Sequence, residues 1–218
     1  MNFKNKLSVQ GDHPLLLEGV VGNLEAVLTV PDQRPCNQVA ILGHPHSLQG
    51  GTMTNKVVTT MARTFKEMGI PSLRFNFRGV GLSSGTYDDG IGESEDMLKL
   101  AGDWLQAEPQ AHFIFAGFSF GSYVAYRAAA QMHHKLLISI APPVHHYDYN
   151  EFQPAPKPWV IVQGDADEVV PEALVMQFAQ TFDPPLPVIH FPHTGHFFHG
   201  KLVELKAQLT ECIQTLDD

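Results

Sequence analysis

Short apolar runs alternate with longer amphipathic segments along most of this chain, and this alternation restricts the fold more than any other feature. Apolar residues in the longer segments recur with the 3.6-residue period of a helix. Strands that alternate with helices pair in parallel, and right-handed crossovers place the helices on both faces of the sheet. The chain is therefore predicted to be an α/β protein. The strands expected from the apolar runs are residues 39–42, 72–75, 113–118, 136–140, 160–162 and 188–191.

The first thirty residues have a different pattern, in which two apolar runs follow each other directly. These runs, residues 15–21 and 24–30, meet at Gly22-Asn23, a pair suited to the positive φ angles of a tight turn. They predict an antiparallel N-terminal hairpin at one edge of the sheet. The complete prediction is an eight-stranded, mostly parallel sheet.

Length and charge restrict the domain organisation and the partners. A chain of 218 residues is long enough to bury a core and too short for two ordinary domains, so residues 1–218 are predicted to form one domain. The formal charge of −9 would be repelled by phosphate backbones and by anionic lipid. We therefore expect neither nucleic acid nor membrane as a partner.

Targeting signals and cysteine motifs are also missing from the sequence. No apolar stretch approaches the roughly 18 residues of a spanning helix, and the first residues lack the apolar core of a signal peptide. Cys36 and Cys212 have neither CxxC nor CxxH spacing, which argues against a disulfide framework or a cysteine zinc site. A cytoplasmic location is expected.

The strongest chemical motif is G-x-S-x-G, which spans Gly117 to Gly121 between a predicted strand and an alanine-rich helical segment. Such a strand-to-helix turn lifts its serine, here Ser119, above the sheet, and the flanking chain passes too close for side chains at the two glycines. The turn also directs the backbone N–H of Phe120 toward the position of a developing oxyanion. These features predict a nucleophile at Ser119.

A serine nucleophile needs a histidine as base and a carboxylate to orient that histidine. Three carboxylates follow the strand at 160–162 and three histidines follow the strand at 188–191, so both groups reach the sheet edge that Ser119 occupies. We assign the acid to Asp167 and the base to His196, whose loop has a glycine before the histidine and phenylalanines after it. The alternatives are Asp165, Glu168, His193 and His199.

Four motifs in order give the chain a resemblance to the α/β-hydrolase superfamily. They are the turn at Ser119, the G-x-x-D segment ending at Asp167, the Gly195-His196-Phe197-Phe198 segment, and the Asn76–Gly85 turn. The last could also be read as a phosphate loop, but it lacks the third glycine of a dinucleotide site. The details resemble a small bacterial branch near dienelactone hydrolases and serine-aminopeptidase-like hydrolases. Dienelactone hydrolases use a cysteine nucleophile, so Ser119 argues against their substrate.

The resemblance has three further implications for the site. By position, the second oxyanion donor is the backbone N–H of His46, although Pro45 replaces the usual glycine and leaves Ser47 as the alternative donor. The interval from Ala141 to Pro158 is too short for the helical cap that many relatives carry. The family analogy also leaves a homodimer open.

The predicted function is that of a carboxylesterase-like serine hydrolase, which cleaves a small-molecule ester through an acyl-enzyme and needs no cofactor. Peptidase and thioesterase activity on the same triad are alternatives within this class, because the pocket and not the triad selects the leaving group. Twelve histidines also suggest a metal-binding protein, although HExxH is absent, and a non-catalytic binding module is a further rival. The residues expected to line an acyl pocket are Phe118, Phe120, Tyr147, Phe197 and Phe198.

Overall fold

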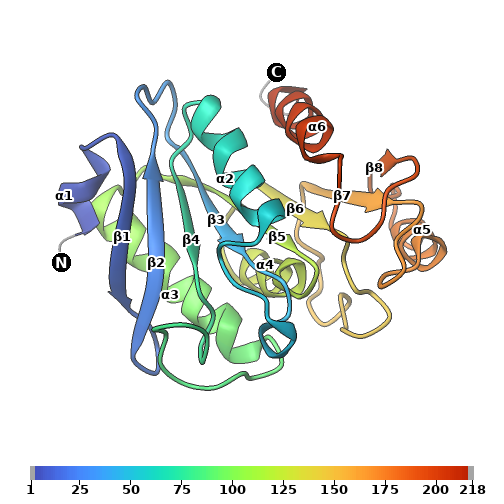
Figure 1. Ribbon diagram of the computed structural model, residues 1–218, viewed down its shortest axis with the longest axis horizontal. Helices are drawn as coiled ribbons and strands as arrows, with labels where there is room; N and C mark the ends of the chain where they lie inside the picture. The colour runs from blue at the N-terminus through green and yellow to red at the C-terminus, as the bar shows by residue number, and fades with distance from the viewer. Residues whose placement is uncertain (1–2, 216–218) are drawn as a thin grey trace.

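The computed structural model describes residues 3–215, which form a twisted eight-stranded sheet between two layers of helices (Figure 1). The strands are β1 (Gly11–Glu18), β2 (Asn23–Val30), β3 (Gln38–Gly43), β4 (Ser72–Phe75), β5 (His112–Phe118), β6 (Leu136–Ile140), β7 (Trp159–Gly164) and β8 (Val188–Phe191). The helices are α1 (Phe3–Leu7), α2 (Lys56–Glu67), α3 (Ile91–Ala107), α4 (Phe120–Gln131), α5 (Glu172–Ala179) and α6 (Leu202–Thr215), with a 3-10 turn η1 (Ser47–Gln49).

The strand order across the sheet is β1-β2-β4-β3-β5-β6-β7-β8. Strand β2 is antiparallel to both of its neighbours, β1 and β4, and every pair from β4 to β8 is parallel. The predicted sheet, with an antiparallel N-terminal hairpin and parallel remainder, is confirmed. Because β3 to β8 all run in the same direction, the loops after their carboxyl ends share one edge of the sheet.

Helices cover both faces of this sheet, as predicted. Helices α2 and α6 lie side by side on one face, and α3 and α4 cover the other (Figure 1). In α2 the apolar positions follow the helical period, so Val57, Met61 and Phe65 are all buried against the sheet. The helix begins where the Asn55 side chain accepts a hydrogen bond from the Val57 N–H at 2.8 Å.

The hairpin differs from the prediction in its turn. Strand β1 ends at Glu18, which pairs with Asn23, so the connection is the four-residue loop 19–22 and not a two-residue turn at Gly22-Asn23. The loop closes through a hydrogen bond from the Gly19 N–H to the Gly22 oxygen, and Asp96 accepts the Val20 N–H at 2.8 Å. This contact with α3, which is remote in sequence, holds Val20 in the loop, so that Val20 and Val21 are not part of the strand, contrary to the prediction. Strand β1 begins at Gly11 and tolerates Pro14 because it is an edge strand.

The segment between β6 and β7 is a plain connection, and the expected absence of a cap is confirmed. It folds back onto α4 through aromatic packing, hydrogen bonds and an ion pair. Tyr149 Oη lies 2.7 Å from Ser122 Oγ, the Phe152 N–H donates to Tyr126 Oη at 3.1 Å, and Glu151 pairs with Arg127. The carboxyl edge of the sheet around Ser119 is therefore not covered by an inserted helical domain.

Over residues 3–215, none of the helices combines the length and the apolar character needed to cross a bilayer.

Candidate active site

Ser119 occupies the turn between β5 and α4 and has a strained backbone, with φ 54° and ψ −125°. The turn is possible because three glycines meet beside it. A Cβ added at Gly117 would lie 2.0 Å from the Gly121 carbonyl oxygen, and a Cβ at Gly121 would lie 2.3 Å from the Gly43 carbonyl carbon. The first and last glycines of the motif therefore need to lack side chains, as the sequence predicted. Gly43, at the end of β3, was not predicted because only the folded sheet brings it to this turn.

The side chains of Ser119, His196 and Asp167 form a hydrogen-bonded chain. His196 Nε2 lies 3.1 Å from Ser119 Oγ, and His196 Nδ1 lies 2.8 Å from Asp167 Oδ2. All three residues are buried, with exposed fractions of 8% for the serine, 3% for the histidine and 7% for the aspartate. The structure thus brings together the three residues that the sequence selected. Such an arrangement allows the imidazole to take the serine proton while the carboxylate fixes the ring.

Asp167 is held in its ionised form by several donors. Its Oδ1 accepts the backbone N–H groups of Val169 at 2.9 Å and Val170 at 2.7 Å, while its Oδ2 accepts the His196 imidazole. Burial raises the pKa of the Asp167 carboxyl, but the hydrogen bonds from His196, Val170 and Val169 outweigh it and hold this pKa below its ordinary value. The acid can therefore remain a carboxylate beside a protonated imidazole.

The neighbouring candidates for acid and base lie outside this chain of hydrogen bonds. His193 and His199 are exposed, as are Asp165 and Glu168. The two carboxylates instead support the histidine loop, because Asp165 Oδ1 accepts the Thr194 N–H and Glu168 Oε2 accepts the His196 N–H, both at 3.3 Å.

The two expected oxyanion donors flank Ser119. Within residues 3–215, the backbone N–H groups of Phe120 and His46 have no hydrogen-bond acceptor, so both are available to a bound oxygen. His46 borders the cavity next to Ser119, whereas Ser47 is not among the residues that line it. The His46 side chain is occupied elsewhere, since its Nδ1 accepts the Leu48 N–H at the start of η1.

His44 anchors the loop that carries His46. It is fully buried, its Nδ1 contacts the Pro45 oxygen at 2.7 Å, and its Nε2 faces the Phe77 N–H at 2.9 Å. These partners require a neutral ring that donates from Nδ1 and accepts at Nε2. Burial lowers the pKa of His44 to about 4, although the hydrogen bond to Pro45 opposes the shift.

A small cavity of about 100 Å³ opens directly beside the serine and the histidine. Of the phenylalanines and tyrosines predicted to line an acyl pocket, the cavity lining includes Phe197 but not Phe118, Phe120, Tyr147 or Phe198. Its wall is formed by Pro45, His46, Gln49, Gly50, Gly51, Asn55, Ser119, Val169, His196 and Phe197.

The other predicted pocket residues have packing partners that explain their positions. Phe198 is fully buried against Phe191, at a ring distance of 5.3 Å, and Phe118 is buried 4.9 Å from the His196 ring. Tyr147 stacks on Tyr123 and packs against Phe120. Periodicity and aromatic character could not separate these core contacts from a pocket lining.

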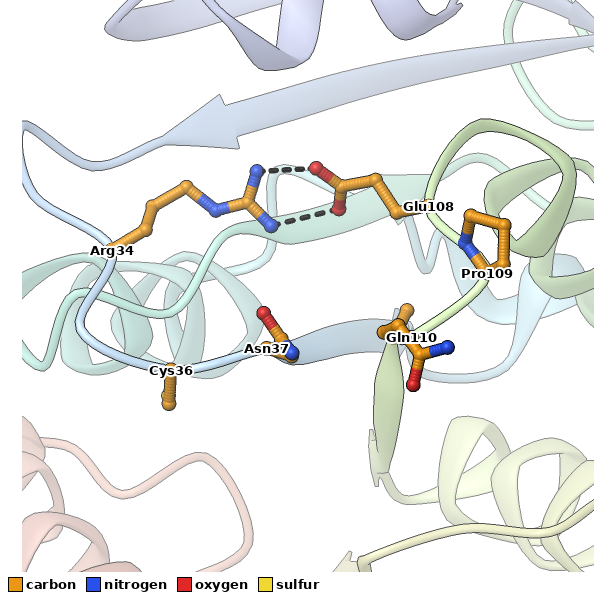
Figure 2. Close-up of a pocket in the computed structure, with 7 residues that line it drawn as sticks. Arg34, Cys36, Asn37, Glu108, Pro109 and Gln110 are labelled. Atoms are coloured by element: carbon orange, nitrogen blue, oxygen red, sulfur yellow. Dashed lines mark hydrogen bonds and ion pairs between the residues drawn. The ribbon is translucent and has the colours of Figure 1, made fainter.

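A second hollow, of about 310 Å³, lies at the opposite edge of the sheet, next to the segments that lead into β3 and β5 (Figure 2). Figure 2 shows the Arg34 guanidinium facing the Glu108 carboxylate, with two hydrogen bonds of 2.6 and 2.7 Å. The Glu108 carboxylate therefore neutralises the charge of the Arg34 guanidinium inside the hollow. Ser119 and His196 lie at the other edge, so this hollow is separate from the candidate site.

The histidine-rich composition does not form a metal centre in the described part of the chain. Among residues 3–215, no three or more histidine, cysteine, aspartate or glutamate side chains are grouped so that they could hold a metal ion. His145 and His146 pair with each other, at a ring distance of 3.9 Å.

Comparisons with known proteins identify several relatives, although no protein-family model matches the chain. An uncharacterized protein of Rickettsia prowazekii is 35% identical over 195 residues, which cover 84% of this chain and 81% of that protein. The chain is also similar to a structure from Coxiella burnetii described as an α/β serine hydrolase homologue. The two share 42% identity and a TM-score of 0.87, and the match covers 93% of this chain and 98% of that one.

A second solved structure, from Xanthomonas campestris, is described as a member of the α/β serine hydrolases without a lid. It is 41% identical, has a TM-score of 0.89, and the match covers 95% of each chain. Each of the two structural matches covers more than nine tenths of this chain.

Proposed function

Because this chain belongs to the α/β serine hydrolases without a lid, and is therefore a hydrolase of this fold, we propose that it cleaves small carboxylic esters. The observation that carries this proposal is the hydrogen-bonded chain from Ser119 Oγ through His196 to Asp167, with distances of 3.1 and 2.8 Å. Ser119 is the nucleophile, His196 the general base and Asp167 the residue that orients the imidazole.

In the first half of the reaction, Ser119 Oγ attacks the ester carbonyl carbon while its proton moves to His196 Nε2. The tetrahedral intermediate then expels the alcohol, which takes this proton from His196, and leaves the acyl group on Ser119. In the second half, water attacks the acyl carbon, gives a proton to His196, and the carboxylic acid leaves as the serine recovers its proton. Asp167 remains ionised and stabilises the imidazolium in both halves.

The negative oxygen of each tetrahedral intermediate is bound by the backbone N–H groups of Phe120 and His46. Both lie next to Ser119 without competing acceptors in the described residues. A donor of this kind contributes on the order of 3 kcal/mol to stabilising the transition state.

The dimensions of the site favour a small substrate. The cavity beside Ser119 measures about 100 Å³, well below the several hundred Å³ of pockets that enclose larger ligands. Phe197 and Val169, at 42% and 44% exposure, place apolar surface at its mouth. A short acyl group fits the cavity, and the alcohol part of the ester can extend past these residues toward solvent. The partner is accordingly a small molecule rather than a macromolecule.

The test uses purified wild type, Ser119→Ala and the control Ser8→Ala, in which the changed serine is exposed and distant from the site. Each protein is treated with a fluorophosphonate, and its intact mass is measured by mass spectrometry. Untreated samples of each protein are assayed on short p-nitrophenyl esters. We expect one adduct and rapid turnover for wild type and Ser8→Ala, and neither for Ser119→Ala. Unlabelled, inactive wild type would overturn the proposal.

The same proteins separate the ester reaction from related ones. Matched thioester and aminoacyl-amide substrates are compared with the esters at equal concentration. A preference for the ester supports the proposal, whereas a higher kcat/KM for the thioester or the amide would assign the same residues to a thioesterase or a peptidase.

A further inference from the structure

Gln163 is a buried polar residue in a strand that is otherwise apolar, directly behind the acid of the site. It belongs to β7, precedes Asp167 by four residues and has no exposed surface. A leucine or methionine would fill similar space without a polar group to satisfy, so packing alone does not explain an amide here.

The surroundings of the amide determine its orientation. Gln163 Nε2 lies 3.0 Å from the Val170 oxygen, 3.1 Å from the Gly164 oxygen and 3.3 Å from Asp167 Oδ2, and all three atoms are acceptors. The reversed amide would place its oxygen against three other oxygens, so the N–H groups must face the Asp167 turn. Within residues 3–215 the amide oxygen, Oε1, is buried without a hydrogen-bond partner.

This arrangement completes the set of donors around the carboxylate. Asp167 Oδ1 is bound by two backbone N–H groups, whereas Oδ2 accepts from the His196 imidazole and from the Gln163 amide. The same amide also joins the two ends of the turn, since it contacts the oxygens of Gly164 before Asp167 and Val170 after it. A rotation of the carboxylate away from His196 would break contacts on both of its oxygens.

We propose that Gln163 is a positioning residue that holds Asp167 Oδ2 toward His196 and, by sharing the charge of that oxygen, limits how strongly the carboxylate binds the imidazole proton. The inference rests on the proposed function, because it assigns Gln163 a task only if His196 acts as the base. The unpartnered Oε1 fits this role, since a residue that leaves a buried oxygen unsatisfied is retained for its donors.

Removing the amide donors has two expected consequences. The carboxylate gains rotational freedom, which lowers kcat, and Oδ2 becomes more basic, which favours the protonated imidazole. The acid limb of the pH–rate profile therefore moves to higher pH. The other titratable groups facing this pair are Glu168, which accepts the His196 N–H, and His145, which interacts electrostatically with Asp167. Asp165 supports the neighbouring Thr194 N–H.

The experiment compares wild type with Gln163→Met, which removes the amide while keeping a similar length. The matched control is Gln180→Met, the same exchange at an exposed position after α5. We expect Gln163→Met to lower kcat by about 10- to 100-fold with little change in KM, and to shift the acid limb upward. The control keeps the wild-type profile. A folded Gln163→Met protein with wild-type kcat and acid limb would overturn the inference.

Two further measurements guard against a merely structural effect. In proton NMR, the downfield resonance of the hydrogen bond between His196 and Asp167 should move in Gln163→Met and stay in place in the control. A second variant, Gln163→Glu, serves also if the methionine variant does not fold. Its introduced carboxyl group should repel Asp167 when it ionises, so activity should fall as pH rises over a range where wild type is constant. A wild-type profile in that variant and an unmoved resonance would each count against the inference.

The outcomes distinguish this inference from the proposed function. If wild type hydrolyses esters and Ser119→Ala does not, but the Gln163 variants behave as wild type, only the positioning role fails. If wild type itself is inactive and unlabelled, the proposed function fails first.

Discussion

A methyl group on Gly117 would lie 2.0 Å from the carbonyl oxygen of Gly121, closer than any two unbonded atoms of this kind can approach. These two glycines lie on either side of Ser119, so the contact sets the shape of the turn that presents the nucleophile. The neighbouring atom belongs to the backbone of α4, which cannot move without displacing the serine.

Gly117→Ala is therefore expected to damage both stability and activity. Overpacking against the backbone should lower the free energy of unfolding by about 1 to 3 kcal/mol, and displacement of Ser119 should reduce esterase turnover further. Urea unfolding and ester hydrolysis measure the two effects. The control is Gly102→Ala in α3, where an added Cβ meets no atom within 4 Å and alanine favours the helix by about 1 kcal/mol. Equal stability changes for the two variants would contradict the packing argument.

His44 should make the protein less stable in mild acid. Burial lowers its pKa from 6.5 to about 4. At pH values between these two, the His44 ring is therefore protonated in the unfolded chain and neutral in the native state. Since the unfolded state binds more protons, stability falls as pH decreases from about 6.5 to about 4, by on the order of 3 kcal/mol from this residue.

The measurement for His44 is urea unfolding at several pH values for wild type and His44→Gln. The variant should be less stable at pH 7 but should lose less stability on acidification. Burial also lowers the pKa of His46, His134 and His145, so the difference between the two proteins isolates the contribution of His44. Parallel pH curves for the two proteins would show that the His44 ring accepts a proton in the folded state.

The ion pair between Arg78 and Asp96 should be essential for the loop that follows β4. Asp96 is fully buried, its Oδ2 lies 2.8 Å from Arg78 Nε and its Oδ1 accepts the Val20 N–H. Asp96→Ala removes the nearer of the two carboxylates paired with a buried guanidinium, which keeps only Asp88 at 3.7 Å, and the expected cost is about 3 to 5 kcal/mol in unfolding free energy.

The same helix supplies the control for this ion pair. Lys99 and Asp103 form an ion pair at 2.7 Å, but both side chains are about one third exposed. Asp103→Ala should cost only about 0.3 to 0.5 kcal/mol, because solvent screens exposed pairs. The prediction requires the cost of Asp96→Ala to be several times that of Asp103→Ala in urea unfolding.

Acyl-chain length should limit the substrates of this site. The cavity of about 100 Å³ accommodates acetyl to butyryl groups, so kcat/KM on p-nitrophenyl esters should fall about tenfold or more for octanoyl. Gln49→Ala removes part of the wall and should extend the range to longer chains, whereas Gln180→Ala, at an exposed position away from the cavity, should leave it unchanged. A wild-type rate that rises steadily from acetyl to octanoyl would rule out the cavity as the acyl site.

Local sequence patterns determined much of the fold. Parallel strands buried on both faces read as short apolar runs, and the helices between them repeat apolar residues every three or four positions, so both were recognisable without structure. The turn at Ser119 was recognisable too, because the glycine spacing follows from a close approach within a few residues. The order of Ser119, Asp167 and His196 along the chain then indicated which loops meet at the sheet edge.

The tertiary structure decided whatever depends on contacts between distant segments. The hairpin turn shifted because Asp96 of α3 binds the Val20 N–H, and Phe198 became a core residue because it packs on Phe191. Gln163 was overlooked, although a polar residue ending an apolar strand was a usable signal. The Gln163 amide can donate to Asp167 only because the turn folds back and places Asp167 Oδ2 3.3 Å from Gln163 Nε2. Local sequence encodes the elements through short-range propensity and periodicity, whereas the hydrogen-bond partners of buried polar groups arise from the packing of the whole chain.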